Sequence, residues 1–478
     1  MKNHQLTIDN RQLEMGWFAR LTIVILLAIC AAAQQPQPPP AQPQPQSAAP
    51  KAAAEHRISS EEAKQLLGAV DQVLKFDSQN TGLPIKAEVK RQLIDRDQVQ
   101  AYIEKQLRED EDAQRLKNGE VVLKKFGLLP RDFSVDTFLV QLMREQVAGY
   151  YDPQSKFVNL LNWLPPETQM PVLAHELTHA LQDQNFGMEK WVRGPNHKKK
   201  MSPAETIADD ESTIARHAIL EGQAMAVMID WMLAPIGKSL LDAPLIVDAM
   251  EAGMSQGGDS PVFNRSPLYL QRILVFPYTY GLDFERALLK QGKDGAFAGV
   301  FQRPPKNTRE VMEPAVYLAN ENLAPLNPPD LAGVLGKEWE LYDVGSIGEF
   351  DVAVMAEQFA EAATSKKIYP NWRGGYYYAL KKKGAEVKGP SDISFVFVTR
   401  WSSADAAKQF LDVYQSSISK RYPGVSGALG AGFGATFSTG EGDVFVGRPG
   451  RLESVIAIES FSQPERQKLY EAIAKTLQ

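Results

Sequence analysis

The chain has 478 residues, of which 44% are hydrophobic and 23% charged, with a formal net charge of -6 and a single cysteine. That length suits two or three domains of about 150 residues, each with a core of its own, and the composition excludes a disordered or collagen-like chain. The mild acidity provides no basic surface for nucleic acid, so we expect no nucleic-acid partner.

An apolar stretch near the N-terminus runs from Leu21 to Ala33. It is shorter than the roughly 20 residues that a membrane-spanning helix needs. We predict that residues 1–33 are a secretory signal peptide cleaved after Ala33, because Ala31 and Ala33 satisfy the small-x-small rule for cleavage. Lipidation of Cys30 and an uncleaved N-terminal anchor are the alternatives.

The next segment, residues 34–57, begins with a run of Gln, Pro and Ala. This composition cannot bury apolar surface and favours an extended linker. An exported domain tethered to a membrane or to the cell envelope through its N-terminus would carry such a spacer. We therefore expect an exported protein that is periplasmic, envelope-attached or extracellular.

A helical pattern follows the linker. Ser59 and Glu62 have the spacing of a capping box, and apolar residues recur at helical spacing after them. Further helices are expected over residues 87–109 and 135–146. Aromatic and β-branched residues on both sides of a turn then predict a β-hairpin over residues 149–160.

The strongest motif is His175-Glu176-Leu177-Thr178-His179, which we place in a helix that follows Pro165, Pro166 and Pro171 and ends near residue 184. Histidines at positions i and i+4 lie on one face of a helix, so both imidazoles can bind one Zn²⁺. Glu176 then lies beside the first ligand, where a general base is needed. His175 and His179 are the predicted zinc ligands.

A catalytic zinc site needs a third protein ligand and an open position. Glu221 is our first candidate, on a helix expected over residues 212–233, because the small residues around it let another helix approach closely. His217, one turn earlier, is either the competing ligand or a hydrogen-bonding neighbour of the ligands. Asp183, one turn after His179, could orient an imidazole.

At this point the chain resembles exported bacterial zinc metallopeptidases of the gluzincin type, over residues 120–320. The segments that carry the resemblance are Gly149-Tyr150-Tyr151-Asp152-Pro153, residues 175–184, Glu221-Gly222-Gln223-Ala224, Pro277-Tyr278-Thr279-Tyr280-Gly281 and residues 304–314. In the last segment the family has a histidine where this chain has Glu313, and an acid where it has Arg309. Activity or substrate preference would change if that histidine helps catalysis.

The resemblance implies an α+β fold in which a mainly helical, zincin-like catalytic domain with a short β-hairpin spans residues 58–335. It implies hydrolysis of peptide bonds in a peptide or protein substrate, with Glu176 as the general base for a water that zinc activates. The hairpin would bind an extended substrate by strand addition. Candidate donors to the developing oxyanion are Tyr150, Tyr151, His217, Tyr278, Tyr280 and Arg309.

Residues 340–478 predict a second, small α+β sandwich domain. We expect strands at 376–380 and 394–401, a helix at 404–414, a hairpin formed by residues 443–446 and 452–458, and a final helix from Pro464. The glycine-rich residues 424–434 lack the spacing of a nucleotide-binding loop, which indicates a hairpin. A catalytically silent module that binds peptide, cell-wall polymer or a partner protein remains the alternative to a peptidase.

Overall fold

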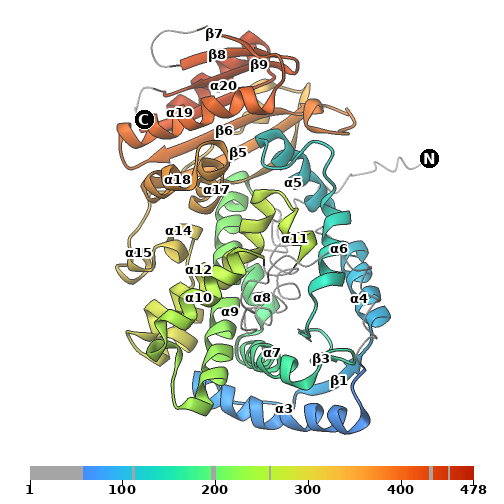
Figure 1. Cartoon of the computed structure of the whole chain (residues 1–478). Coiled ribbons are helices and arrows are strands. Elements are labelled where there is room, and N and C mark those ends of the chain that lie inside the picture. Colours follow the sequence, from blue (N-terminus) through green and yellow to red (C-terminus); the bar gives the residue numbers. More distant parts are fainter. Residues whose placement is uncertain are drawn as a thin grey trace, which may run out of the picture.

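The computed structural model describes residues 57–109, 113–194, 201–257, 260–429, 434–449 and 453–477. The predicted signal peptide, Cys30 and nearly all of the predicted linker lie outside these residues. The fold is α+β (Figure 1): a helical region carries a small three-stranded sheet, and a seven-stranded antiparallel sheet lies at the end of the molecule opposite to helix α3 (Ser60–Thr81).

Within the described residues, nine strands and helices of the helical region precede its longest helix, α9. In chain order they are α3, β1 (Lys90–Ile94), α4 (Arg96–Glu109), α5 (Ala113–Phe126), α6 (Val135–Gln146), β2 (Tyr150–Asp152), β3 (Phe157–Leu161), α7 (Pro166–Phe186), α8 (Met188–Arg193) and then α9 (Pro203–Leu233). The region continues with α10 (Pro244–Ser255), α11 (Pro261–Asn264), α12 (Leu268–Leu289), α13 (Val300–Gln302), α14 (Thr308–Met312), α15 (Pro314–Leu318) and α16 (Leu331–Leu335).

Local signals placed several of these elements correctly. The capping box at α3 is present, because the Ser59 hydroxyl accepts from the backbone N–H of Glu62 while the Glu62 carboxylate accepts from the N–H of Ser59. Helix α6 spans the predicted residues 135–146, and β2 and β3 form the predicted antiparallel hairpin. In these places hydrogen bonds between chain neighbours decide the structure.

Three predicted boundaries are wrong. Residues 90–94 form strand β1 instead of helix, because they pair in parallel with β3, a partner more than sixty residues away. Helix α7 begins at Pro166 and continues through Pro171. A proline is tolerated at the first helical position because the backbone N–H that it lacks would have no acceptor within the helix. Helix α9 begins at Pro203, nine residues before the predicted start, behind a capping box formed by Ser202 and Glu205.

The three-stranded sheet has the order β1-β3-β2, so β2 is an edge strand beside α7. Gln169 ties the end of this sheet to the first turns of α7. Its amide bonds both the N–H and the C=O of Leu161 and also the C=O of Leu164. The hairpin is therefore held in a fixed position against the helix that carries the His-Glu-x-x-His motif.

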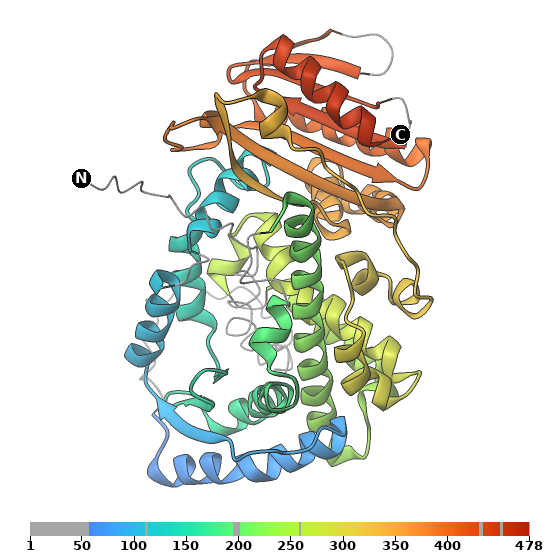
Figure 2. The ribbon, with the colours of Figure 1, turned by 180° about the vertical axis from the view of Figure 1, so that it is seen from behind.

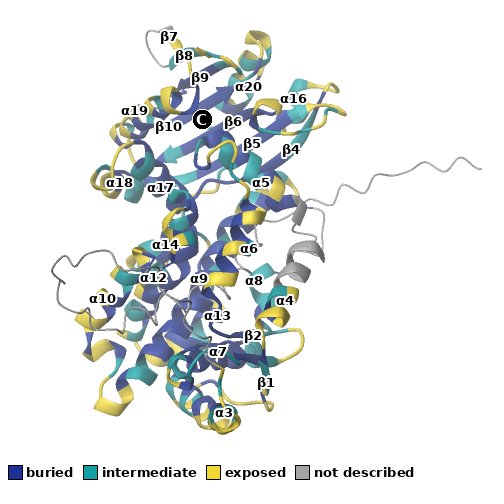
Figure 3. Ribbon diagram, turned by 45° about the vertical axis from the view of Figure 1, so that its right-hand side comes forward, coloured by how far each residue is buried: buried dark blue, intermediate teal, exposed yellow. Residues whose placement is uncertain are grey.

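Helix α9 is the central axis of the molecule and runs from the α3 end to the large sheet (Figure 2). Among the described helices, α9 with its following turn to Ile236 is the one long and apolar enough to cross a membrane, and 67% of its most apolar stretch is buried. That burial is typical of a core helix. Figure 3 shows α9 dark along most of its length.

Close packing of α9 against α12 fixes the rotation of α9. A Cβ atom on Gly222 would collide with the backbone of Gly281, and one on Gly281 would collide with the carbonyl of Ala218. The backbones of α9 and α12 are therefore in direct contact at these glycines, and a side chain at either position would push the helices apart. The sequence predicted that the small residues beside Glu221 face the histidine helix; Gly222 faces α12 instead, and Glu221 consequently points toward α7.

All strands of the large sheet follow residue 338. The elements are β4 (Trp339–Ser346), α17 (Glu349–Phe359), α18 (Ala362–Ile368), β5 (Trp372–Lys382), β6 (Ser394–Trp401), α19 (Ala404–Arg421), β7 (Ser426–Leu429), β8 (Gly434–Thr439), β9 (Gly442–Gly447), β10 (Ser454–Glu459) and α20 (Gln463–Thr476). The strand order is β4-β5-β6-β10-β9-β8-β7. Strands β7 and β8 pair as the hairpin predicted for the glycine-rich segment.

Helices cover both faces of this sheet, so it is not a two-layer sandwich. Alternate residues of β5 enter different cores: Tyr377 and Ala379 join the core shared with the helical region, and Tyr376 and Tyr378 join a second core under α16 and α20. The shared core continues from α3 to the sheet. Strand β4 and helices α17 and α18 were not predicted.

Candidate metal centre

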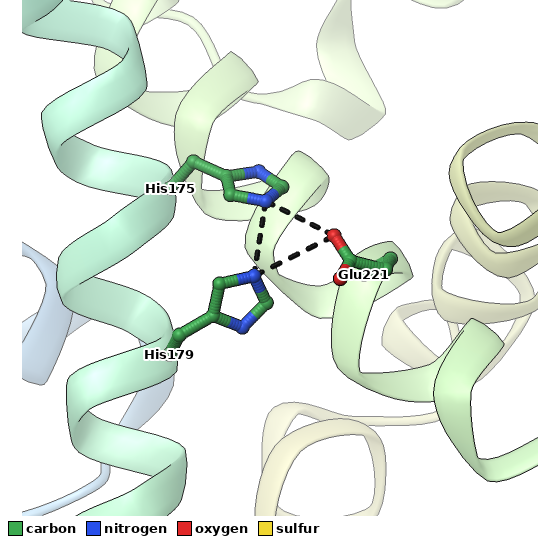
Figure 4. A group of neighbouring side chains, drawn as sticks. All are labelled: His175, His179 and Glu221. Atoms are coloured by element: carbon green, nitrogen blue, oxygen red, sulfur yellow. Dashed lines mark hydrogen bonds and ion pairs between the residues drawn. The ribbon is translucent and has the colours of Figure 1, made fainter. Parts of the chain in front are cut away.

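Two helices position the candidate metal-binding residues. His175 and His179 lie one turn apart on α7, and Glu221 lies on α9, which crosses beside it (Figure 4). The Nε2 atoms of the two histidines are 3.0 Å apart. Glu221 Oε2 lies 3.1 Å from Nε2 of His175 and 3.5 Å from Nε2 of His179.

These distances fit one metal ion. Ligands at about 2.0 to 2.1 Å in a tetrahedron are separated from one another by about 3.3 to 3.4 Å, close to the three distances observed. The donor set of two imidazole nitrogens and one carboxylate oxygen is also one that zinc favours. Among the described residues, His175, His179 and Glu221 are the group of side chains that could hold a metal ion.

The charge balance at the centre also calls for a cation. All three side chains have no exposed surface. Burial disfavours a charged histidine, yet the Glu221 carboxylate outweighs burial and raises the pKa of His179 to about 9. Burial would raise the pKa of Glu221, but the adjacent imidazoles hold it well below its usual range. The Glu221 carboxylate therefore favours a positive charge beside it, which a protonated His179 or a metal ion can supply.

A hydrogen-bonded chain of two glutamines sets the tautomer of His179. The amide nitrogen of Gln223 donates to the carbonyls of Ala296 and Phe297, which leaves its oxygen to accept from Gln182. The Gln182 nitrogen also donates to the Leu220 carbonyl, so its oxygen faces Nδ1 of His179 at 2.8 Å.

It follows that Nδ1 of His179 carries the proton and donates to Gln182. In a neutral imidazole the lone pair is then on Nε2, which points at the centre. The backbone carbonyls of Ala296 and Phe297, 73 and 74 positions after Gln223, thus help to fix His179 in its ligating form. Sequence reasoning missed both glutamines, although Gln182 lies three residues after His179 on the same helix face.

Glu176 lies beside the centre and is held by the edge strand. Its Oε2 accepts a 2.7 Å hydrogen bond from the backbone N–H of Tyr151, and its Oε1 has no hydrogen-bond partner among the described residues. Burial raises the pKa of Glu176 to about 8. The carboxylate therefore binds a proton more tightly than an exposed glutamate does, and one oxygen is available to accept it.

His217 lies against Glu221 and not among the three ligand atoms. Its Nε2 is 3.6 Å from Glu221 Oε1, the oxygen that faces away from the two histidines. Burial lowers the pKa of His217 to about 4, which makes it a neutral imidazole at physiological pH. The structure thus brings Glu221, and not His217, to both motif histidines.

The side-chain partners of Asp183 lie on the hairpin and not on the histidines. Its Oδ2 accepts from the Tyr151 hydroxyl at 2.8 Å and pairs with Lys156 at 2.6 Å. Asp183 therefore fastens the hairpin to α7. The role predicted for it, orientation of a histidine, is carried out by Gln182.

Of the remaining candidate residues, Tyr278 lies near the centre, whereas Tyr150, Tyr280 and Arg309 make structural contacts elsewhere. The Tyr278 ring stacks on His175 with centroids 6.3 Å apart. Tyr150 stacks on Tyr102, and Tyr280 packs on Phe276 and Tyr369.

Arg309 also has structural partners. It is buried and forms 3.0 Å and 3.1 Å ion pairs with Glu349 and Glu313, so it joins α14 to α17. Glu313, for which the resemblance led us to expect a histidine, is an ion-pair partner of Arg309.

Comparison of the chain with protein families, with curated proteins and with solved structures found no match. The geometry of the centre is therefore the basis for the functional argument.

Proposed function

We propose that this protein is a zinc-dependent peptidase of the gluzincin type. The observation that carries the proposal is the convergence of three ligand atoms within 3.0 to 3.5 Å of one another, with the Glu176 carboxylate beside them. Three ligands leave a fourth position open, which is typical of catalytic zinc, whereas structural zinc has four protein ligands. An exported location remains part of this proposal.

In this proposal His175 Nε2, His179 Nε2 and Glu221 Oε2 hold the ion. Bound zinc would polarise the scissile carbonyl and make an attacking water more acidic. Glu176 Oε1 accepts the proton of that water and passes it to the leaving amine. The Tyr151 N–H orients the other oxygen of Glu176 throughout, and burial of the carboxylate keeps competing solvent away.

The edge strand β2 would hold the substrate. Tyr151 pairs with Val158 on β3, while its N–H donates to Glu176 of α7 at the other edge of β2. A peptide that adds to this edge therefore passes the general base. Main-chain hydrogen bonds would give affinity without demanding a particular sequence.

A second candidate function is a metal-stabilised module that binds peptide, cell-wall polymer or a partner protein without cleaving it. Complete burial favours it, because His175, Glu176, His179 and Glu221 have no exposed surface and a substrate must displace what covers them. The presence of Glu176 favours the peptidase, because a silent module has no use for a base at this position.

The test is to measure the zinc content of the full chain and its cleavage of a denatured protein mixture. We expect Glu176→Gln to keep zinc and to lose cleavage by at least 100-fold, and Glu221→Ala to lose most of the zinc. Glu167→Gln, on an exposed turn of the same helix, is the matched control and should keep both. Full zinc occupancy in Glu221→Ala would refute the ligand assignment, and cleavage by Glu176→Gln would refute the base.

A further inference from the structure

A polar cavity of about 190 Å³ lies at the N-terminal end of α7. Its charged lining consists of Arg96, Arg144 and Glu145. The Arg96 guanidinium stacks over the Trp163 ring at 4.7 Å. Glu145 Oε2 accepts hydrogen bonds from the Ser260 hydroxyl and the Val262 N–H. This oxygen therefore has partners other than the two arginines. Two of the three charged side chains that line the cavity are therefore guanidinium groups.

The cavity is in line with the metal centre. Thr168 lines it, and His175 lies seven residues later on α7. Seven residues are about two helical turns, so both side chains lie on one face of the helix, about 10 Å apart along its axis. The N-terminus of α7 also presents its positive dipole end at the cavity.

The edge strand connects the two places. Tyr151 contacts Glu176, and Val147 and Ala148, which precede β2, line the cavity. The four extended steps from Val147 to Tyr151 span about 13 Å, and the eight helical steps between Thr168 and Glu176 span about 12 Å. The strand and the helix therefore run side by side from the cavity to the centre.

The direction of a bound peptide follows from this arrangement. An added strand that continues the antiparallel β3-β2 hairpin runs from beside Asp152 toward Val147. The part of the peptide after the cleaved bond then points into the cavity. At about 3.3 Å per residue, 10 Å corresponds to three residues.

We propose that this cavity binds a carboxylate that lies two to three residues after the cleaved bond, above all the C-terminal carboxylate of a short peptide. Arg96 and Arg144 are the specificity-determining residues, because guanidinium groups bind carboxylates through charge-assisted hydrogen bonds. This inference rests on the proposed peptidase function and names its substrate class. An acidic side chain at the same distance would supply the same chemistry.

The experiment compares three sets of synthetic peptides that share their sequences, incubated with the zinc-loaded full chain. One set has free C-termini, the second has C-terminal amides, and the third has amides with Asp as third residue from the end. Mass spectrometry locates the cuts. We expect cuts two to three residues before a free C-terminus, with a KM about tenfold lower than for amides. Cleavage of the third set alone would assign the cavity to acidic side chains.

Variants separate the cavity from the centre. Arg96→Gln and Arg144→Gln should remove the preference for a carboxylate by raising the KM for peptides with free C-termini to that for the amides. Arg448→Gln removes the same charge from the residue that follows β9, which does not line the cavity, and should keep the preference. Equal KM values for acids and amides in the unaltered chain would overturn the inference while the peptidase proposal stands. No cleavage of any set would overturn the proposed function and this inference with it.

Discussion

Glu221 and Glu459 are both glutamates without exposed surface, yet their surroundings differ completely. Glu459, on β10 of the large sheet, accepts four hydrogen bonds: two from the Arg421 guanidinium and one each from the hydroxyls of Tyr414 and Tyr422. Both of its oxygens are satisfied by the protein. Glu221 has one oxygen between two imidazoles, and its other oxygen has no hydrogen-bond partner among the described residues.

This difference in hydrogen bonding distinguishes Glu459, a structural charge, from Glu221, a candidate metal ligand. In both cases neighbouring groups hold the pKa of the carboxyl below its usual range against the effect of burial. Around Glu459 the compensating charge is a guanidinium that belongs to the chain. Around Glu221 the neighbouring groups are the imidazoles of His175 and His179, whose Nε2 atoms can bind a metal ion together with the carboxylate.

The largest expected effect is on folding. Glu459→Gln leaves the buried Arg421 guanidinium without its counter-ion, and we expect the free energy of unfolding to fall by about 3 to 5 kcal/mol, measured by urea denaturation. Zinc content under native conditions should stay unchanged, in contrast to Glu221→Ala. The exposed Glu386→Gln is the control and should change stability by less than about 0.5 kcal/mol. A loss of zinc in Glu459→Gln under native conditions would contradict the assignment of Glu459 as a purely structural charge.

A smaller effect is expected where the protein supports the centre without touching the ion. Gln182→Leu removes the acceptor that holds the proton on Nδ1 of His179, so we expect zinc affinity to fall about 10- to 100-fold, measured by competition with a chelator. Gln182→Glu keeps an acceptor at this position and should retain more affinity than the leucine variant. Equal affinity in the leucine variant and the unaltered chain would show that the tautomer needs no support.

The smallest expected effect is a pH dependence at the joint between α9 and the large sheet. Burial raises the pKa of Glu211 from its ordinary value of 4.5 to about 7, although Thr308 donates two hydrogen bonds to it. The folded state thus binds this proton more tightly than the unfolded state. The stability that Glu211 contributes is present below pH 4.5 and is lost as the pH rises through 7.

The Glu211→Gln variant isolates this contribution. Its free energy of unfolding, relative to that of the unaltered chain, should increase between pH 5 and pH 8. Asp343, whose pKa burial raises to about 6, remains in both proteins and cancels in the difference. Asp351, whose pKa burial also raises to about 6, repels Glu211, so its titration forms part of the measured difference. A difference that is constant over this range would show that Glu211 stays ionised in the fold.

The sequence by itself determined the features that depend on neighbours along the chain. Helical periodicity puts His175 and His179 on one face, the capping box begins α3, and the alternating pattern predicts the β2-β3 hairpin. Each of these needs contacts over only a few residues, so local propensity and spacing are sufficient.

Only the tertiary structure decided how the centre is completed. Glu221 lies 46 positions from His175, and it reaches α7 because Gly222 and Gly281 let α9 and α12 touch backbone to backbone. The Gln182-Gln223 chain depends on carbonyls still further along the chain. These contacts exist only once distant helices pack, so the sequence could name Glu221 as the first candidate beside His217 but could not place its carboxylate at the two histidines.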